Sequence, residues 1–380
     1  MNAAYLDYNA TAPVKPEVAA AVARALDLVG NPSSVHSYGR AARKAVEDAR
    51  ERVAALTGAT PAEVVFTASA TEANNLVLAG AGRTRRIVTA IEHPAVLKTA
   101  QSLPGETVVL PVDGDGVVAL EALEAALKNS TTPTLVALML ANNETGAVQP
   151  VAEATRLAHD HGALIHCDAV QAPGRLAFSL ATLGVDYLCL SAHKFAGPKG
   201  VGALIVRDGA PLKSVVIGGG QERGRRAGTE NVPGIVGFGE AAWLAPQDLA
   251  NAPRLARLRD RLESRLLEIE PRLHVFSAKA PRLPNTSCLT MPGVQSEMQV
   301  MALDLAGVAV SAGSACSSGK VEPSHVLRAS GVPDAVSGCA IRVSLGWATR
   351  EEDIETFLAA WRALYAGLTN RWRSGISSAL

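Results

Sequence analysis

Short apolar segments alternate with amphipathic segments along the first two thirds of the chain. Short apolar runs of this kind predict buried strands, and apolar positions at helical spacing predict helices. The predicted strands span residues 63–66, 86–90, 107–110, 134–140, 163–168, 186–190 and 202–206. The predicted helices between them span residues 71–79, 94–102, 120–128 and 151–161. This alternation is typical of an α/β fold, so we expect a mainly parallel seven-stranded sheet with helices on both faces.

The pattern changes after about Pro246. The remaining elements are predicted as helices at 253–269, 296–306 and 351–365 and strands at 287–290 and 340–345. We therefore expect a large domain at residues 16–250 and a smaller α+β domain at 251–380. Residues 1–15 precede the first helix of the large domain, and we expect them to pack with the small domain.

Charge and composition exclude several classes of partner. The 380 residues include 36 Lys and Arg and 36 Asp and Glu, so the net charge is zero. This balance favours neither a nucleic acid nor an anionic membrane surface as a partner. The N-terminus lacks the basic and apolar regions of a signal peptide, and no apolar run is long enough to span a bilayer. We expect a cytoplasmic protein.

The cysteines do not form a disulfide or zinc pattern. They number five, are widely spaced and include no CxxC pair: Cys167, Cys189, Cys288, Cys316 and Cys339. We expect most of them to be small buried hydrophobic residues, including Cys339, which stands three residues before Arg342. Cys316 differs because it lies in SAGSACSSG, a run of small residues that predicts an exposed loop. A thiol in such a loop is a candidate nucleophile.

Lys194 follows a predicted buried strand, in the sequence Ser191-Ala-His193-Lys194, and a Gly- and Pro-rich turn comes next. A lysine at a strand end is commonly a solvated surface charge. An amine that is partly desolvated and close to other cations has a lowered pKa and becomes a nucleophile toward carbonyl groups. These are the requirements for a lysine that binds pyridoxal phosphate as a Schiff base.

Two other strand ends carry groups that this cofactor needs. Asp168 ends the predicted strand 163–168 and could keep the pyridine nitrogen protonated, although a helix cap or a turn is the alternative. Gln171 follows and could bond the phenolic oxygen. Ala70 and Thr71 open a predicted helix, where free N–H groups favour a phosphate, unless Thr71 is only the helix cap.

Polar residues also follow two further predicted strands. His93 lies at a strand-to-helix junction, where it could stack on the cofactor and exchange protons or serve a purely structural role. Asn142, Asn143 and Glu144 follow the strand 134–140, and their amides could bond cofactor and substrate. Ligands of such sheets bind at the carboxyl ends of the strands, so these groups are expected to converge on one site.

With these residues in view, the sequence resembles the pyridoxal-phosphate-dependent cysteine desulfurases of the class V aminotransferase superfamily. The nitrogen-fixation and iron–sulfur-cluster type is the most similar. The likeness covers essentially the whole chain and implies the pyridoxal-phosphate-dependent transferase fold of type I. The motifs that carry it are YLDYNATAP (5–13), GNPSSVHSYGR (30–40), FTASATEANN (66–75), EHPAV (92–96), NNETGAVQP (142–150), HCDAVQAPG (166–174), SAHKFAGPKGVGAL (191–204), GGGQERGRRAGTEN (218–231), SAGSACSSGKVEPSHVLRA (311–329) and IRVSLGWAT (341–349).

The resemblance implies a role for each matching residue. Lys194 would hold the cofactor and move the Cα proton, with Asp168 on the pyridine nitrogen and Gln171 on the phenolic oxygen. His93 would stack on the ring. The phosphate would be held by Ala70, Thr71, Ser191 and His193, and by Thr229 of a partner subunit, which implies a homodimer. Asn143 and Arg342 would bind the substrate carboxylate, although Arg342 could instead form only a structural salt bridge.

The implied reaction converts L-cysteine to L-alanine and leaves the sulfur on Cys316 as a persulfide, in a mobile loop at about residues 311–322. An iron–sulfur scaffold or another sulfur-acceptor protein would take the sulfur. We expect no resident metal, and it stays open whether Cys316 transiently ligates an iron–sulfur cluster shared with a scaffold. The alternatives are a selenocysteine lyase, an aminotransferase that does not need Cys316, or a non-catalytic dimer that binds a sulfur carrier.

Overall fold

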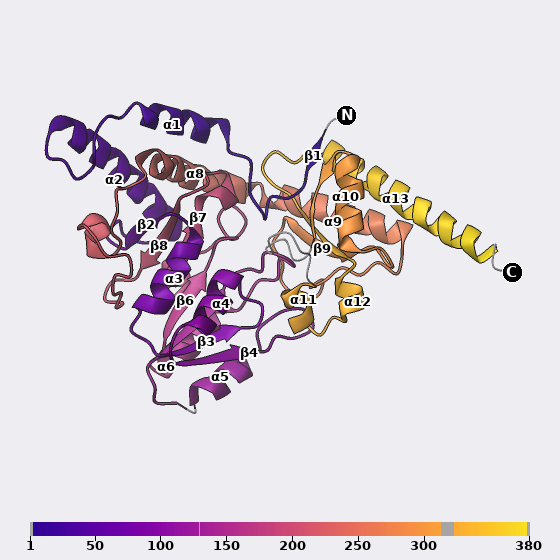
Figure 1. The fold of residues 1–380 in the computed structure, drawn as a ribbon, viewed down its shortest axis with the longest axis horizontal. Helices are drawn as coiled ribbons and strands as arrows, with labels where there is room; N and C mark the ends of the chain where they lie inside the picture. The colour runs from indigo at the N-terminus through magenta and orange to yellow at the C-terminus, as the bar shows by residue number, and fades with distance from the viewer. Residues whose placement is uncertain (1–2, 129, 313–322, 378–380) are drawn as a thin grey trace.

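The computed structural model describes residues 3–128, 130–312 and 323–377 of the chain (Figure 1). Within these residues, a seven-stranded sheet and a three-stranded sheet lie side by side with their helices, and a third sheet has two short strands. The large sheet and the first eight helices occupy one part of the molecule, and the C-terminal elements occupy the other.

The large sheet has seven strands, as predicted, and their order is β2-β8-β7-β6-β5-β3-β4. The strands are β2 (Val64–Thr67), β3 (Arg85–Thr89), β4 (Glu106–Leu110), β5 (Thr134–Met139), β6 (Leu164–Asp168), β7 (Tyr187–Ser191) and β8 (Gly202–Val206). Only β8 runs against its neighbours, pairing antiparallel with both β2 and β7. The expectation of a mainly parallel α/β sheet is confirmed.

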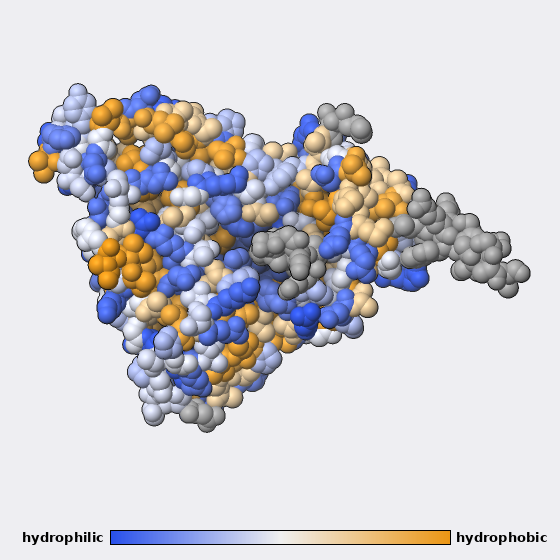
Figure 2. All heavy atoms as spheres, viewed as in Figure 1, coloured by the Kyte–Doolittle hydropathy of each residue, from blue (hydrophilic) through white to orange (hydrophobic). Residues whose placement is uncertain are grey.

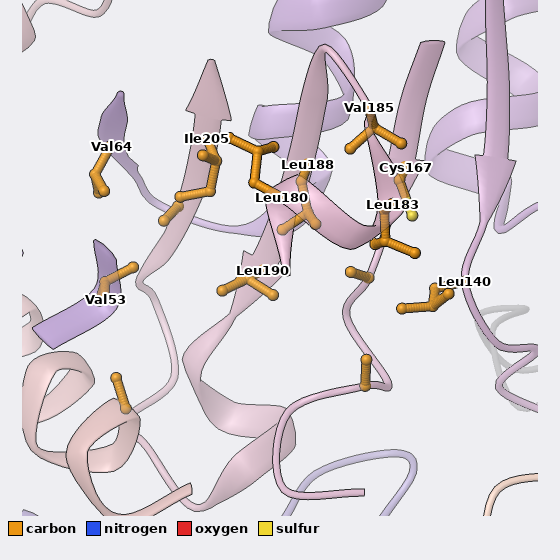
Figure 3. Close-up of a cluster of buried hydrophobic side chains, with 14 of the residues drawn as sticks. Val53, Val64, Leu140, Cys167, Leu180, Leu183, Val185, Leu188, Leu190 and Ile205 are labelled. Carbon is orange, nitrogen blue, oxygen red and sulfur yellow. The ribbon is translucent and has the colours of Figure 1, made fainter. Parts of the chain in front are cut away.

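Helices cover both faces of this sheet and place an apolar core on each. One core contains Val53, Leu188 and Leu190 and lies under α2, α6 and α8 (Figure 3). The other contains Leu76 and Val96 and lies under α3 and α4. The helices are α1 (Pro16–Leu26), α2 (Ser37–Thr57), α3 (Ala70–Gly80), α4 (Pro94–Ser102), α5 (Leu120–Lys128), α6 (Val151–Asp160), α7 (Leu180–Leu183) and α8 (Val232–Ala250).

A second, antiparallel sheet has the strand order β11-β12-β9 and its own core, which includes Leu262, Val343 and Trp361. Its strands are β9 (Thr286–Thr290), β11 (Ser311–Ala312) and β12 (Ala340–Ser344), while β10 (Val308–Ala309) belongs to a separate two-stranded sheet. The helices are α9 (Ala252–Ile269), α10 (Ser296–Leu305), α11 (His325–Ala329), α12 (Asp334–Ser337) and α13 (Glu351–Ser377). Helix α13 continues past the predicted end at residue 365 and projects from the rest of the molecule (Figure 1).

The N-terminal residues join this second part of the structure. Strand β1 (Ala4–Tyr5) pairs in parallel with β10. The backbone of Asp7 forms an isolated parallel β-bridge with that of Ser344 on β12. Leu6 is fully buried in the same core as α9 and α13. The division of the chain into domains at residues 15 and 250 stays a prediction.

Across the described ranges, no helix has both the length and the apolar character needed to cross a membrane.

Candidate active site

A cavity of about 290 Å³ opens at the carboxyl ends of β5, β6 and β7 and reaches β12 of the second sheet. Ten of the residues predicted from sequence line it: Ala70, Thr71, His93, Asn143, Asp168, Gln171, Ser191, His193, Lys194 and Arg342. These residues come from segments that are far apart in the chain, and they meet at the carboxyl ends of the strands, where ligands of such sheets bind.

The start of α3 forms one wall of the cavity. Ser69, rather than Thr71, caps the helix, because its Oγ accepts the N–H of Glu72 at 3.2 Å. The first N–H groups of a helix have no partner within the helix, and Ala70 and Thr71, the first residues of α3, line the cavity. This end of α3 is suited to an anion such as a phosphate.

Asp168 ends β6 and is 8% exposed. Its Oδ2 accepts a hydrogen bond from Asn74 Nδ2 at 3.0 Å, and its Oδ1 accepts the N–H of Val170 at 3.1 Å. The next helix begins at Leu180, so Asp168 caps no helix. Both oxygens of the Asp168 carboxyl group therefore accept hydrogen bonds at the cavity, an arrangement that suits a cationic ligand group.

Lys194 lies in a short 3₁₀ turn, Ala192–Phe195, directly after β7. Its Nζ donates to the carbonyl oxygens of Asn9 at 2.7 Å and Ala10 at 3.0 Å. The amine is thus held at the cavity wall and is not a solvated surface charge. Beside it, burial and the charges of Lys194 and Lys199 lower the pKa of His193 to about 4, so its imidazole is neutral near pH 7.

His93 has the structural role that was one alternative, and it also lies at the cavity. Its Nδ1 accepts the N–H of Ala95 at 3.1 Å and so caps α4, while the ring lines the cavity. Because Nδ1 is an acceptor, the neutral ring carries its proton on Nε2. Burial lowers the pKa of His93, which favours this neutral form.

Gln171 is held from two sides. Its Nε2 donates to the Asn9 carbonyl oxygen at 3.1 Å, and its Oε1 accepts from Arg175. Arg175 also donates to the carbonyl oxygens of Tyr8 at 3.2 Å and Lys194 at 3.0 Å. Burial lowers the pKa of Arg175 to about 10. This guanidinium therefore fixes the turn that carries the candidate lysine.

Arg342 forms the salt bridge that was the structural alternative, and it also lines the cavity. Its guanidinium donates to Asp7 Oδ1 at 2.8 Å and to the Asn143 carbonyl oxygen at 3.1 Å. Its Nε has no partner among the described residues, although it is buried. The remaining N–H groups suit a carboxylate, which a guanidinium binds with two parallel hydrogen bonds.

Among the described residues that were predicted from sequence, Thr229, Asn142 and Glu144 do not line this cavity. Thr229 is exposed and lines a separate hollow together with Glu222 and Arg226, so its predicted role toward a partner subunit stays a prediction. Cys316 lies outside the described residues. The other cysteines are buried as expected, and Cys339 is 5% exposed and does not line the cavity.

Sequence reasoning missed two asparagines of the site. Asn9 and Asn74 line the cavity and are each 1% exposed. Both lie inside motifs that were recognised, YLDYNATAP and FTASATEANN, but neither follows a predicted strand. The only signal was a small polar residue within an otherwise recognisable motif.

Comparisons with known proteins identify the family of this chain. The family model described as aminotransferase class-V matches residues 4–357. The chain is 47% identical to a cysteine desulfurase of Cereibacter sphaeroides, with 94% of each chain covered. It is 42% identical to the cysteine desulfurase IscS of Dictyoglomus turgidum, with 92% of this chain and 91% of the relative covered.

Solved structures lead to the same family. A NifS-like protein that is 38% identical superposes with a TM-score of 0.89, covering 96% of this chain and 99% of its own. A NifS-like protein from Rickettsia africae has the same TM-score at 34% identity, with 96% and 100% covered. The chain therefore belongs to the class-V aminotransferase family, and within it to the cysteine desulfurases.

Proposed function

We propose that this chain is a pyridoxal-phosphate-dependent cysteine desulfurase that converts L-cysteine to L-alanine. The observation that carries the proposal is that Lys194, Asp168, Arg342 and the start of α3 share one cavity. The relatives named cysteine desulfurase, which match nearly the full length, support it independently.

The residues present fit pyridoxal phosphate. The amine of Lys194 would hold its aldehyde carbon, and the carboxylate of Asp168 would bond its ring nitrogen. The start of α3, with Ser191 and His193, would hold its phosphate, and Thr229 of a second subunit would add a contact. Gln171 would bond its phenolic oxygen, and His93 would lie against its ring. When bound, the cofactor supplies an electron sink that stabilises negative charge at the substrate Cα.

The chain's own residues would then carry out binding and proton transfer. Arg342 and Asn143 hold the substrate carboxylate, which fixes the Cα–H bond relative to Lys194. The Lys194 amine takes the Cα proton and returns a proton to the carbon skeleton. Positioned proton transfer of this kind contributes about 10²–10⁴-fold to a rate. His93, with its proton on Nε2, is the second group that can exchange a proton with the substrate.

Cys316 is proposed as the sulfur acceptor, on the basis of the family resemblance. Its thiolate attacks the substrate sulfur, the C–S bond breaks, and the carbon skeleton leaves as alanine after protonation. One thiol and one cysteine thus give one persulfide and one alanine, with no external oxidant. A sulfur-acceptor protein, such as an iron–sulfur scaffold, would regenerate the thiol.

The proposal includes a homodimer in the cytoplasm. Exposed apolar side chains at Val215, Val216 and Ile217 lie in the segment that leads to Thr229. Figure 2 shows hydrophobic side chains gathered on the end of the molecule that α1 and α2 form. Covering such a surface with a second subunit would also bring Thr229 to the partner's phosphate site.

Purified protein incubated with pyridoxal phosphate, L-cysteine and a reductant tests the proposal. We expect equal amounts of alanine and sulfide from the wild type, and near loss of both in Lys194→Ala and Cys316→Ala. Equal alanine from wild type and Cys316→Ala would overturn the persulfide step. A strong preference for selenocysteine over cysteine would instead identify a selenocysteine lyase.

A further inference from the structure

A buried polar cluster behind Asp168 has no part in the reaction as proposed above. It consists of Asn74 on α3, His166 on β6 and Cys189 on β7, which are 1%, 0% and 0% exposed. His166 stands two residues before Asp168 on the same strand, so both side chains lie on the same face of the sheet. The cluster therefore connects the sheet, the helix α3 and the carboxylate of the site.

The directions of the hydrogen bonds in this cluster follow from its chemistry. Asn74 Nδ2 donates to Asp168 Oδ2 at 3.0 Å, because an amide nitrogen only donates and a carboxyl oxygen accepts. Asn74 Oδ1 then accepts from His166 Nε2 at 2.6 Å and from Cys189 Sγ at 3.1 Å. His166 must therefore carry its proton on Nε2. The two donors fix the orientation of the Asn74 amide, so its N–H₂ group always faces Asp168.

His166 serves as a neutral donor in this cluster. Burial lowers the pKa of His166 to about 4, so its imidazole is neutral near pH 7. A neutral ring adds no positive charge beside Asp168 that would compete with a cationic ligand group. The ring contributes one N–H group, which donates to Asn74 Oδ1 and so sets the orientation of the Asn74 amide.

We propose that His166 and Asn74 are positioning residues that keep the carboxylate of Asp168 oriented as the acceptor for the protonated ring nitrogen of pyridoxal phosphate. This inference rests on the proposed function. A hydrogen bond donated to a carboxylate lowers its proton affinity. With the Asn74 bond in place, the proton between carboxylate and ring stays on the ring nitrogen. His166 acts one step further away, by preventing the Asn74 amide from turning its oxygen toward Asp168.

The colour of the bound cofactor reports on this proton without any turnover. A positive ring nitrogen withdraws electrons from the rest of the cofactor. The Lys194 nitrogen that is joined to the cofactor therefore loses its proton at a lower pH. Asn74→Leu removes one donor from Asp168 at similar side-chain volume. We expect the pH midpoint of the colour change to move upward by about one unit, which corresponds to a tenfold change in proton affinity.

Two variants of His166 distinguish the effect of its hydrogen bond to Asn74 from the effect of its packing in the core. The Nε2 atoms of glutamine and histidine are the same number of bonds from Cβ, so His166→Gln can still donate to Asn74 Oδ1. We expect His166→Gln to keep the wild-type midpoint and His166→Leu to move it upward. If Asn74→Leu does not fold, this pair decides the question. Val88→Ala truncates a fully buried side chain in the core beside this cluster, so it should lower thermal stability and leave the midpoint unchanged.

The possible results have distinct meanings. If the wild type binds pyridoxal phosphate and converts cysteine, but His166→Leu and the folded Asn74→Leu share its midpoint, the inference is wrong and the proposed function stands. If Val88→Ala moves the midpoint as much as His166→Leu does, general destabilisation explains the shift and the inference is also wrong. If the wild type takes up no pyridoxal phosphate, the proposed function fails and the inference fails with it.

Discussion

Arg175 is a buried cation whose hydrogen bonds end on the side chain of Gln171 and on the carbonyl oxygens of Gln171, Tyr8 and Lys194. Arg175→Met keeps much of the apolar stem and removes every donor. Unsatisfied buried acceptors cost about 1–3 kcal/mol each, while removal of a buried charge offsets part of that cost. We expect the free energy of unfolding to fall by about 3 kcal/mol, measured by urea denaturation.

Arg261 provides the matched control for this prediction. Its guanidinium forms ion pairs with Glu351 and Glu355 at the surface, and its side chain is 46% exposed. Exposed ion pairs contribute less than about 1 kcal/mol, so Arg261→Met should be nearly neutral. An equal loss in the two variants would show that Arg175 contributes nothing beyond an ordinary surface arginine.

Glu144 gives a prediction about pH. It is buried, its carboxyl accepts from Ser324, and burial raises its pKa to about 7. Between its ordinary pKa of 4.5 and 7, the unfolded chain loses this proton while the folded protein keeps it. The stability contribution of Glu144 is therefore present at low pH and is lost as pH rises through this window.

Glu144→Gln removes this titration and keeps an acceptor for Ser324. Its free energy of unfolding relative to the wild type should rise by on the order of 3 kcal/mol between pH 5 and pH 8. Urea denaturation at both values measures this, and the contribution of Glu92, whose pKa burial raises to about 8, cancels in the difference. Glu297→Gln, at an exposed position, should change little at either pH. A pH-independent difference for Glu144→Gln would contradict the prediction.

Which site residues the sequence revealed depended on their place along the chain. Lys194 and Asp168 could be predicted because they directly follow continuous apolar strands. Asn9 precedes the first helix, and Asn74 lies inside one, so no local pattern marks either as part of the site. Only the tertiary structure brings them to the carboxyl ends of the strands.

At the scale of elements, the seven strands of the large sheet were predictable because nearly all of them are buried on both faces. Helix α8 shows the opposite case. Its glycines disfavour a helix in isolation, yet a Cβ at Gly239 would lie 2.6 Å from Ala49, and one at Gly237 would lie 2.5 Å from Val22. Close packing against α1 and α2 therefore requires glycines, and because glycines have a low helix propensity, the local sequence does not predict this helix.

In the large sheet, Gly202 is also packed closely against its neighbours, and this contact leads to a testable prediction. A Cβ there would lie 2.8 Å from the Leu190 carbonyl oxygen and 3.0 Å from the Ala70 nitrogen, at the start of α3. Gly202→Ala must push β8 away from the helix end that is proposed to hold the phosphate. Overpacking typically costs about 1–3 kcal/mol, so we expect a stability loss of about 2 kcal/mol and weaker binding of pyridoxal phosphate, measured by fluorescence titration.

Gly114 is the control for this substitution. A Cβ at Gly114 would meet no atom within 4 Å, so Gly114→Ala should leave stability and cofactor affinity unchanged. Unaltered cofactor affinity in Gly202→Ala would mean that the start of α3 does not depend on its contact with β8.

At the scale of the whole molecule, Asn9 joins the two sheets at the site. Its carbonyl oxygen accepts from Lys194 and Gln171, on the large-sheet side. Its side chain bonds Asn285 at 3.1 Å and Thr286 at 2.9 Å in the second part of the structure, and its Nδ2 also donates to the Asn143 carbonyl oxygen at 3.1 Å. The residue that holds the candidate lysine is thereby positioned by the opposite sheet.

Asn9→Ala removes the side-chain bonds and leaves the backbone contacts in place. Buried partners left without hydrogen bonds should lower the free energy of unfolding by about 2 kcal/mol. Because the Asn9 carbonyl then loses its support from the second sheet, kcat for alanine formation should fall about tenfold, with a smaller change in KM. Asn31→Ala, at an exposed position, should stay within about 0.5 kcal/mol of the wild type and keep its kcat. If Asn9→Ala lost stability but kept its kcat, the two sheets would still be joined through Asn9, but the position of Lys194 would be set by the large sheet alone.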